Sequence, residues 1–404
     1  MERLSVLEIT SPVTSVAGRL LADAGARVVK VESPGTRAPA SGLGLARRQY
    51  QDTDKESLSL GLTTPEGAGL LAELTANFDI LLESGHPGWL SGIGLGYDHL
   101  STSNPALTVV SITPFGQTGP YSGWKADDLV AFAMGGLMFI SGTPGRPPLV
   151  APCEQAWMTA GVHAAGAALA GWWAAAETGR GEWVDVSMME CLAAQECTVT
   201  NFRGGEEFTR RVGSQHRTAL PGRIFRCKDG YVHVFVSQDR AVWRRFVAWA
   251  GAPPELASPD LAEINERWRN AAIVDAVADR FMATKSREEL FTTGQAHHLP
   301  VAPVYTVAEA LADPHVRYLD VLDDVGWGQP GGAVEADEAT GAIAGATAPI
   351  LPPYRTLKPA LRRGLPDAER RRAPMPGQDT DRLLSELLGM SREDCTRLRG
   401  AGVV

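Results

Sequence analysis

The chain has 404 residues, of which 44% are hydrophobic and 21% charged, and its formal net charge is −9 at neutral pH. These values predict a globular protein with a large buried core and two domains. The acidic balance argues against a nucleic-acid partner, because such a partner would require a broad basic face. A small anionic ligand remains compatible, since a few local cations and helix N-termini suffice to bind phosphate groups.

The cysteines and the apolar runs indicate which class of protein this is and in which compartment it is expected. The chain has five cysteines with no CxxC and no paired spacing, a pattern typical of reduced thiols in a cytoplasmic protein. The apolar run at the N-terminus is too short for a secretion signal or a membrane span. The longest apolar stretch, residues 156–176, contains Thr159, His163 and many small residues. We therefore expect a buried helix there and no membrane partner.

The first half of the chain alternates strand and helix patterns, and this alternation indicates the fold class. The expected helices cover residues 15–25 and 64–74. The expected strands cover residues 4–9, 26–33, 57–62, 78–84 and 104–112. Strands that alternate with helices predict an α/β fold with a parallel sheet covered on both faces.

A long helix is expected over residues 155–176, and its alanines and glycines would let another backbone approach closely. A short strand over residues 182–188 and a helix through Glu190 follow. The sequence pattern then changes near residue 220. Residues 222–236 predict a β-hairpin that turns at Lys228-Asp229-Gly230.

Three further helices are expected after this hairpin, at residues 240–250, 269–283 and 286–293. Residues 325–365 are rich in Gly, Pro and Ala without a long periodic run, and helix returns after residue 377. The predicted organisation is a large α/β domain over 1–220, a smaller α+β domain over 221–325, and a linker and return to the large domain over 326–404.

Common nucleotide and metal motifs are absent from the sequence. There is no P-loop, and Gly92-Ile93-Gly94-Leu95-Gly96 lacks the spacing of a dinucleotide fingerprint. The sequence has no HExxH motif and no clustered set of histidine and carboxylate ligands. We therefore predict no metal site.

Several longer sequence segments, spread over nearly the whole chain, follow one another in an order that indicates a protein family. The two most diagnostic are FGQTGPY at 115–121 and TGRGEWVDVS at 178–187; LLADAGARVVKVESPG at 20–35 and LPVAPVYTVAEALADPHV at 299–316 accompany them. Together they resemble the family III CoA-transferases, the family of formyl-CoA:oxalate transferase, carnitine CoA-transferase and α-methylacyl-CoA racemase.

The resemblance implies a particular architecture and substrate. It implies a Rossmann-like parallel-sheet domain that binds coenzyme A or acyl-CoA, with a smaller α+β domain inserted in mid-chain. It also implies a dimer whose two subunits are threaded through one another as interlocked rings. The implied partners are an acyl-CoA, a carboxylate substrate and a second subunit.

One position departs from the family pattern. In the transferases an aspartate lies four residues before the glycine that is Gly161 here, and its carboxylate carries the acyl group as an anhydride and then as a thioester. That position holds Trp157 in this chain. The racemases use a histidine and an aspartate. The histidine corresponds to Asp127 here, and the aspartate corresponds to Trp157, as it does in the transferases. An indole can neither form an acyl anhydride nor act as a base.

Three nearby carboxylates are candidates for catalysis. Glu154 lies three residues before Trp157, at the predicted start of the long helix, where the helix dipole favours an anion. Asp127 and Asp128 open another predicted helix. Each of the three could instead be a helix cap or first-turn charge, so the residues alone leave both roles open.

The coenzyme A contacts that the resemblance implies carry over only in part. Val13 and Thr14 occupy the loop position after the first strand, where the family often has Ala-Gly-Pro. Ser33 replaces an arginine that meets the nucleotide phosphates in some members. His86 replaces the arginine of an Asn-Phe-Arg-Pro-Gly turn, and is a weaker, pH-dependent partner for phosphate.

Lys125 matches a lysine that lies over the adenine or the phosphates in some relatives. Arg47, Arg48 and Lys55 are further cations in the region where phosphates could bind. Each of these side chains could also be an ordinary solvated charge.

Three functions remain open from the sequence. The first is a CoA-transferase that moves CoA between carboxylic acids with a non-standard catalytic residue or without a covalent step. The second is a catalytically silent subunit in a heteromer with an aspartate-bearing homologue. The third is a racemase-like or dehydratase-like acyl-CoA enzyme on the same scaffold. A homodimer and a heteromer are both compatible with these alternatives.

Overall fold

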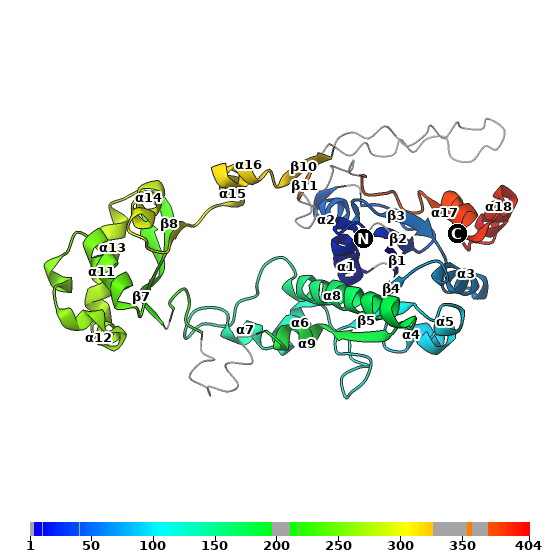
Figure 1. Ribbon diagram of the computed structural model, residues 1–404, viewed down its shortest axis with the longest axis horizontal. Helices are drawn as coiled ribbons and strands as arrows, with labels where there is room; N and C mark the ends of the chain where they lie inside the picture. The colour runs from blue at the N-terminus through cyan, green and yellow to red at the C-terminus, as the bar shows by residue number, and fades with distance from the viewer. Residues whose placement is uncertain are drawn as a thin grey trace. The chain divides into compact units, whose positions relative to one another are not determined.

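The computed structural model describes residues 4–9, 11–39, 41–195, 211–216, 218–325, 354–357 and 371–404. The chain divides into two compact units (Figure 1). The first contains Met1–Leu137, Ala151–Val199 and Asp320–Val404, and the second contains Met138–Val150 and Thr200–Leu319. The boundary expected near residue 220 lies inside the second unit.

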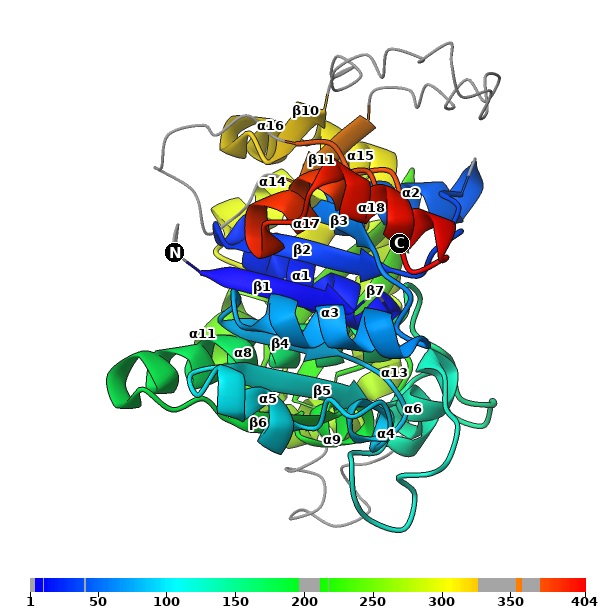
Figure 2. The same cartoon turned by 90° about the vertical axis from the view of Figure 1, so that its right-hand side faces the viewer.

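A six-stranded sheet forms the centre of the first unit, in the order β3-β2-β1-β4-β5-β6 (Figure 2). Every neighbouring pair is parallel, which confirms the predicted α/β class. This is the Rossmann strand order, in which the crevice between β1 and β4 opens at the carboxyl ends of the strands. The strands are β1 (Ser5–Ile9), β2 (Arg27–Glu32), β3 (Glu56–Ser59), β4 (Ile80–Glu83), β5 (Thr108–Thr113) and β6 (Trp183–Ser187).

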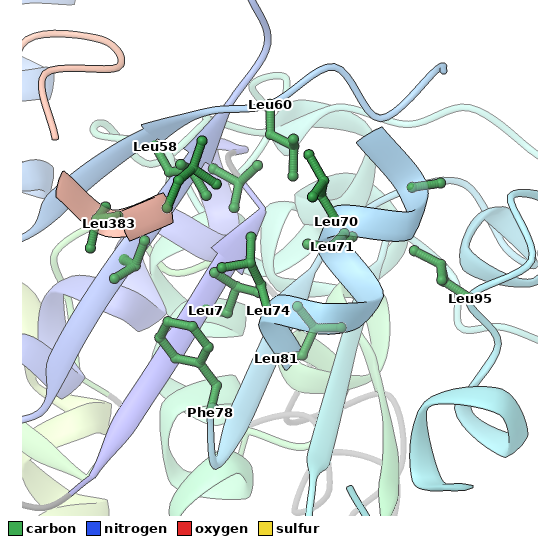
Figure 3. Close-up of a cluster of buried hydrophobic side chains, with 14 of the residues drawn as sticks. Leu7, Leu58, Leu60, Leu70, Leu71, Leu74, Phe78, Leu81, Leu95 and Leu383 are labelled. Atoms are coloured by element: carbon green, nitrogen blue, oxygen red, sulfur yellow. The ribbon is translucent and has the colours of Figure 1, made fainter. Parts of the chain in front are cut away.

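Helices cover both faces of this sheet. One face carries α1 (Pro12–Asp23), α2 (Gly42–Asp52) and α8 (Gln155–Thr178); the other carries α3 (Pro65–Thr75), α5 (Tyr97–Ser103), α17 (Thr380–Leu388) and α18 (Arg392–Gly400). Leucines from β1, β3, β4, α3 and α17 meet in one buried cluster on the second face (Figure 3). The shorter helices of this unit are α4 (Trp89–Gly92), α6 (Asp128–Met134) and α9 (Met188–Ala193), and α7 (Leu137–Ile140) begins at its edge.

Helix α1 begins three residues earlier than the expected range of 15–25. Ser11 is its N-cap and accepts a hydrogen bond from the Thr14 amide, while the Thr14 hydroxyl accepts one from the Ser11 amide. Pro12 occupies the first turn, where its missing amide hydrogen costs nothing. Val13 and Thr14 therefore lie inside the helix and are buried, rather than in a loop.

Helix α8 packs against α1 and β5 through its glycines, as the small residues of this helix predict. A Cβ at Gly161 would lie 2.5 Å from Val16 Cγ1, and one at Gly171 would lie 2.6 Å from Thr108 Cγ2. Only glycine permits this approach without displacing the neighbouring side chain. Gly166, by contrast, has nothing within 4 Å of the corresponding point.

The second unit is built on an antiparallel sheet of β7 (Ala219–Cys227), β8 (Gly230–Ser237) and β9 (Val301–Pro303). Phe225, Trp243, Phe246 and Leu290 contribute to its core. The predicted hairpin and the three predicted helices are confirmed. The helical elements are α11 (Arg240–Trp249), η2 (Pro254–Leu256), η3 (Pro259–Ala262), α12 (Ile264–Arg269), α13 (Ala271–Ala283), α14 (Arg287–Ala296), α15 (Val307–Ala312) and α16 (Pro314–Leu319).

The C-terminal part of the chain returns to the first unit. After the antiparallel pair β10 (Leu322–Val325) and β11 (Tyr354–Leu357), α17 and α18 pack beside β3 and α3 (Figures 1 and 2). The Gly61 amide donates to the Val403 carbonyl at 2.7 Å. The helical return predicted after residue 377 is therefore confirmed, whereas most of the expected irregular stretch 325–365 lies outside the described residues.

Two features are absent from the part of the chain that the structure describes. None of its helices is long and apolar enough to cross a membrane. It also contains no group of three or more His, Cys, Asp or Glu side chains arranged to hold a metal ion.

Candidate functional site

Several of the predicted site residues lie at the carboxyl edge of the six-stranded sheet. Ser33 follows β2 and His86 follows β4. Helix α8 leads into the parallel strand β6, so its N-terminus also starts at this edge. Ligands of open α/β sheets bind outside the carboxyl ends of the strands, near the point where the strand order reverses.

The start of α8 has an unusual backbone. Its N-cap residue is Glu154, with φ 51°, and Cys153 before it has φ 68°. Two successive non-glycine residues in the left-handed region are uncommon and cluster at functional sites. The Glu154 side chain makes no capping hydrogen bond to the helix, so its carboxylate points elsewhere.

Asp128 caps α8 in place of Glu154. Its Oδ1 accepts a hydrogen bond from the Trp157 backbone amide at 2.9 Å, which is the kind of bond that an N-cap side chain normally makes. Asp128 belongs to α6, so the cap comes from a different helix. This contact gives Asp128 a structural role as the cap of α8. The Glu154 side chain is therefore not needed as a cap.

Arg47 of α2 holds the Glu154 carboxylate in an ion pair. The guanidinium carbon of Arg47 also lies 5.8 Å from the ring centroid of Trp157, within the range of a cation–π contact. The side chains of Arg47 and Glu154 are 31% and 38% exposed, so both remain accessible to a ligand. We call Arg47, Asp128, Glu154 and Trp157 the α8-start cluster.

Asp127 has a local structural role. It is the N-cap of α6, and its Oδ1 accepts a hydrogen bond from the Val130 amide at 3.0 Å. The helix-opening role considered from the sequence is therefore confirmed for Asp127, and Asp128 opens the same helix while it caps α8.

The residues considered for coenzyme A lie in different environments. Lys125, His86 and Ser33 are exposed, so a ligand could reach each of them. The side chains of Val13 and Thr14 are buried, and the Thr14 hydroxyl donates to the Ile9 carbonyl at 3.0 Å.

Two of the other cations are neither solvated nor free for phosphate. Arg48 donates to both oxygens of Glu32 at 2.7 and 2.9 Å and to the Pro374 carbonyl at 2.8 Å. Lys55 donates to Glu8 at 2.6 Å, and both side chains are fully buried. The two pairs belong to one charged group beneath α1 and α2. We call it the buried ion network; its members are Glu8, Lys30, Glu32, Arg48, Asp52 and Lys55.

A buried carboxyl that the sequence analysis did not single out lies at the end of β4. Glu83 is 3% exposed and accepts a hydrogen bond from the Gly85 amide at 2.7 Å. Burial raises the pKa of Glu83, although hydrogen bonds from Ser111 and Gly85 oppose the shift. The signal in the sequence was a carboxylate directly after a run of apolar strand residues.

The sheet edge near Glu83 is lined by polar groups from β5, β6 and the following loop. Ser111 pairs in register with Glu83 and with Asp185, and it accepts a hydrogen bond from the Trp183 indole at 2.9 Å. The Gln117 backbone amide donates to the Asp185 carboxylate at 2.8 Å. This contact holds the loop of the FGQTGPY segment against β6.

The sequence profile of CoA-transferase family III matches residues 1–380. The chain belongs to CoA-transferase family III. The resemblance inferred from the ordered segments is thereby confirmed.

Curated relatives and solved structures agree with this membership. The chain is 30% identical over 308 residues to the succinyl-CoA–D-citramalate CoA-transferase of Chloroflexus aurantiacus. The matched region covers 74% of this chain and 76% of that protein. It is 30% identical over 404 residues to the succinyl-CoA–L-malate CoA-transferase beta subunit of the same organism, covering 95% and 93%. A CaiB/BaiF family protein from Brucella suis has a similar fold, with a TM-score of 0.77 at 25% identity, covering 95% of this chain and 98% of that one.

Proposed function

We propose that this chain is a CoA-transferase that moves CoA between two carboxylic acids, with Glu154 as the acyl carrier. The observation that supports Glu154 is its position. Its carboxylate is released from capping by Asp128, is held by Arg47, and lies at the start of the helix that carries Trp157. The substrates are an acyl-CoA and a free carboxylate, and the chemistry needs no metal ion.

The reaction balances as two exchanges at one carboxyl group. The Glu154 carboxylate attacks the thioester carbonyl, the carbon–sulfur bond breaks, and CoA thiolate leaves a mixed anhydride. The thiolate then attacks the Glu154 carbonyl, which forms a glutamyl-CoA thioester and releases the first acid as a carboxylate. The second acid repeats the two steps in reverse, so that its CoA ester leaves and Glu154 is restored.

Coenzyme A lies along the carboxyl edge of the sheet in this proposal. The exposed Lys125 and His86 meet its phosphates, Ser33 lines the same edge, and the first turn of α1 with Val13 and Thr14 supplies backbone nearby. Salt should weaken the binding, because these contacts are exposed and electrostatic. Lys125→Ala should lower the affinity for coenzyme A measured by calorimetry, and no binding at millimolar concentration would contradict this placement.

Asp127 and Asp128 act indirectly in this proposal. Their hydrogen bonds to the backbone of Val130 and Trp157 fix the starts of α6 and α8, and the start of α8 carries Glu154. The racemase-like or dehydratase-like alternative gains no support from this geometry, because Asp127 is engaged as a cap and Trp157 cannot move a proton.

The proposal also covers the domain organisation and the assembly of the protein. In this proposal the first unit is the CoA-binding domain, the second unit is the smaller inserted domain, and the chain from Asp320 onward returns to the first. Two subunits are interlocked in a cytoplasmic dimer. If tagged and untagged subunits exchange freely under native conditions, the interlocked arrangement is wrong.

The test of Glu154 is chemical trapping. Incubation with an acyl-CoA followed by hydroxylamine should convert Glu154 to its hydroxamate, seen as a mass shift on the Glu154 peptide. Glu154→Gln should abolish both the label and turnover. Turnover that survives Glu154→Gln would exclude Glu154 as the acyl carrier.

One observation favours a second candidate, the silent subunit of a heteromeric transferase. Trp157 occupies the aspartate position of the transferases, and one relative is named as the beta subunit of a two-subunit enzyme. In that case the purified chain would be inactive alone and would gain activity with an aspartate-bearing homologue. The trapping experiment on the isolated chain separates the two candidates.

A further inference from the structure

Arg47 is the cation that lies against the proposed acyl carrier. Within the part of the chain that the structure describes, its guanidinium hydrogen-bonds to one group, the Glu154 carboxylate. The guanidinium carbon also lies 5.8 Å from the centre of the Trp157 ring, a contact that attracts a cation whether or not a carboxylate is present. Arg47 is therefore held at the start of α8 by two contacts, of which one involves the reacting group.

The proposed reaction passes one negative charge from group to group beside Arg47. Before the reaction the charge is on the Glu154 carboxylate. When this carboxylate attacks the thioester, the carbon–sulfur bond breaks, and the electron pair leaves with the CoA sulfur while the anhydride stays neutral. When the thiolate attacks the Glu154 carbonyl, the charge moves to the released carboxylate, and the glutamyl-CoA thioester is neutral. The second acid reverses these two exchanges, so the number of charges at the centre is constant.

Each of these anions forms next to the group that Arg47 contacts. The thiolate leaves the carbon to which a Glu154 oxygen has just bonded, and the carboxylate leaves the Glu154 carbonyl itself. The Arg47 side chain is 31% exposed, so water screens its charge only in part, and loss of every counter-ion would be unfavourable. A guanidinium has five N–H donors, which lets it exchange one anion for the next without moving far.

We propose that Arg47 is a catalytic residue that pairs in turn with the Glu154 carboxylate, the CoA thiolate and the substrate carboxylate. This proposal rests on the proposed role of Glu154 as the acyl carrier. It gives Trp157 a function, because the indole face keeps the guanidinium in place while Glu154 is uncharged. The main consequence concerns the anhydride stage: Arg47 retains the thiolate, so the thiolate attacks the Glu154 carbonyl before water does.

The first test follows the fate of the anhydride. Acetyl-CoA, butyryl-CoA and succinyl-CoA serve as donors, each with its own isotope-labelled acid as the acceptor, so that transfer appears as label in the CoA ester and hydrolysis as free CoA. In Arg47→Met the thiolate escapes and water cleaves the anhydride, so the ratio of hydrolysis to transfer should rise roughly tenfold, the loss expected for one charge-assisted hydrogen bond. Arg47→Lys keeps the charge and should restore most of the wild-type ratio.

The second test needs no turnover. Glu154→Gln mimics the uncharged, acylated state, so in this variant Arg47 is available to the thiol of bound CoA. Titration of the thiolate by ultraviolet absorbance should place the pKa of the bound thiol about one unit or more below that of free CoA. Adding Arg47→Met should abolish this shift, and desulfo-CoA, which has no thiol, provides the blank. The matched control is Arg397→Met, which breaks another exposed arginine–glutamate pair and should change neither measurement.

Two results would overturn the proposal. One is an Arg47→Met enzyme in which hydrolysis and transfer fall together at the wild-type ratio, which would indicate a structural role. The other is a bound thiol whose pKa in Glu154→Gln is the same with and without Arg47. The proposed function fails separately, when Glu154 takes no hydroxylamine label and none of the three donors supports transfer. The thiol titration then still decides whether Arg47 meets the sulfur of CoA.

Discussion

Arg47 and Arg48 are neighbours on α2, yet they belong to two different regions of the molecule. Arg48 faces the sheet and joins the buried ion network through Glu32 and the Pro374 carbonyl. Arg47 faces the start of α8 and pairs with a half-exposed Glu154. The same residue type thus serves the interior in one case and an accessible site in the other.

The difference shows what makes a charge structural. In the buried ion network each charged group has fixed partners, and the Ser15 and Ser57 hydroxyls add hydrogen bonds to Glu8 and Glu32. Removing one member leaves an uncompensated charge in the interior. In the α8-start cluster both partners of the ion pair are partly exposed, so a ligand could reach either of them.

The largest expected effect comes from breaking the most buried pair. Lys55→Met removes the partner of Glu8 where both side chains are fully buried, so the free energy of unfolding should fall by about 3–5 kcal/mol. Urea denaturation followed by circular dichroism measures this change.

A second variant distinguishes lost charge pairing from lost packing. Adding Glu8→Gln to Lys55→Met should recover part of the stability, because no uncompensated charge then remains. A Lys55→Met protein as stable as the wild type would contradict the structural role given to the network.

The neighbouring arginines give the most direct comparison. Arg48→Met should lower the free energy of unfolding by about 2–3 kcal/mol, since it leaves the buried Glu32 carboxylate without its bidentate partner. Arg47→Met should change it by less than about 1 kcal/mol, because exposed pairs contribute little. Parallel urea titrations of the two variants measure both values, and similar losses would erase the distinction between the regions.

Stability should also depend on pH through Glu32. Burial disfavours its carboxylate, but the hydrogen bonds from Arg48, the charge of Lys30 and the bond from Ser57 hold the pKa of Glu32 below its usual range. Its contribution to stability is therefore present above the unfolded pKa of about 4.5 and is lost as the pH falls through the folded value. Arg48→Met should flatten this acid limb in pH-dependent unfolding experiments, whereas Arg47→Met should leave it unchanged.

A smaller effect is expected along α8, which begins in the α8-start cluster and packs against α1. Gly161→Ala places a methyl group against Val16 and should lower the free energy of unfolding by about 1–3 kcal/mol. Gly166→Ala, in open space on the same helix, should instead raise it by up to about 1 kcal/mol. Thermal unfolding of both variants tests the pair, and equal shifts would show that α8 is not seated closely on α1.

Much of the fold could be predicted because the local signals agree with the tertiary structure. Each predicted strand of the first half lies within a few residues of β1 to β5, since buried parallel strands are short apolar runs. The start of α1 was misplaced by three residues, although Ser11 followed by Pro12 is a recognisable helix-start signal. That error moved Val13 and Thr14 from a buried helical turn into a supposed loop.

The candidate site could be predicted only in part. The position of Glu154 at the start of α8 followed from the helix pattern. Its ion pair with Arg47 joins residues 107 positions apart, and no local pattern encodes such a contact. Nor could the sequence say which of Arg47 and Arg48 faces the sheet, because that depends on how α2 is rotated over β2.

The return of the C-terminal segment to the first unit bears on the order in which the protein can mature during translation. Leu383, Leu384 and Leu398 complete the apolar cluster over β1 and β3, but the ribosome makes them after the whole second unit. The part of this cluster that α17 and α18 cover must therefore remain exposed while the second unit emerges, and the second unit can fold first. Pulse proteolysis of stalled nascent chains would show this as early protection of residues 219–303 and late protection of β1 to β4.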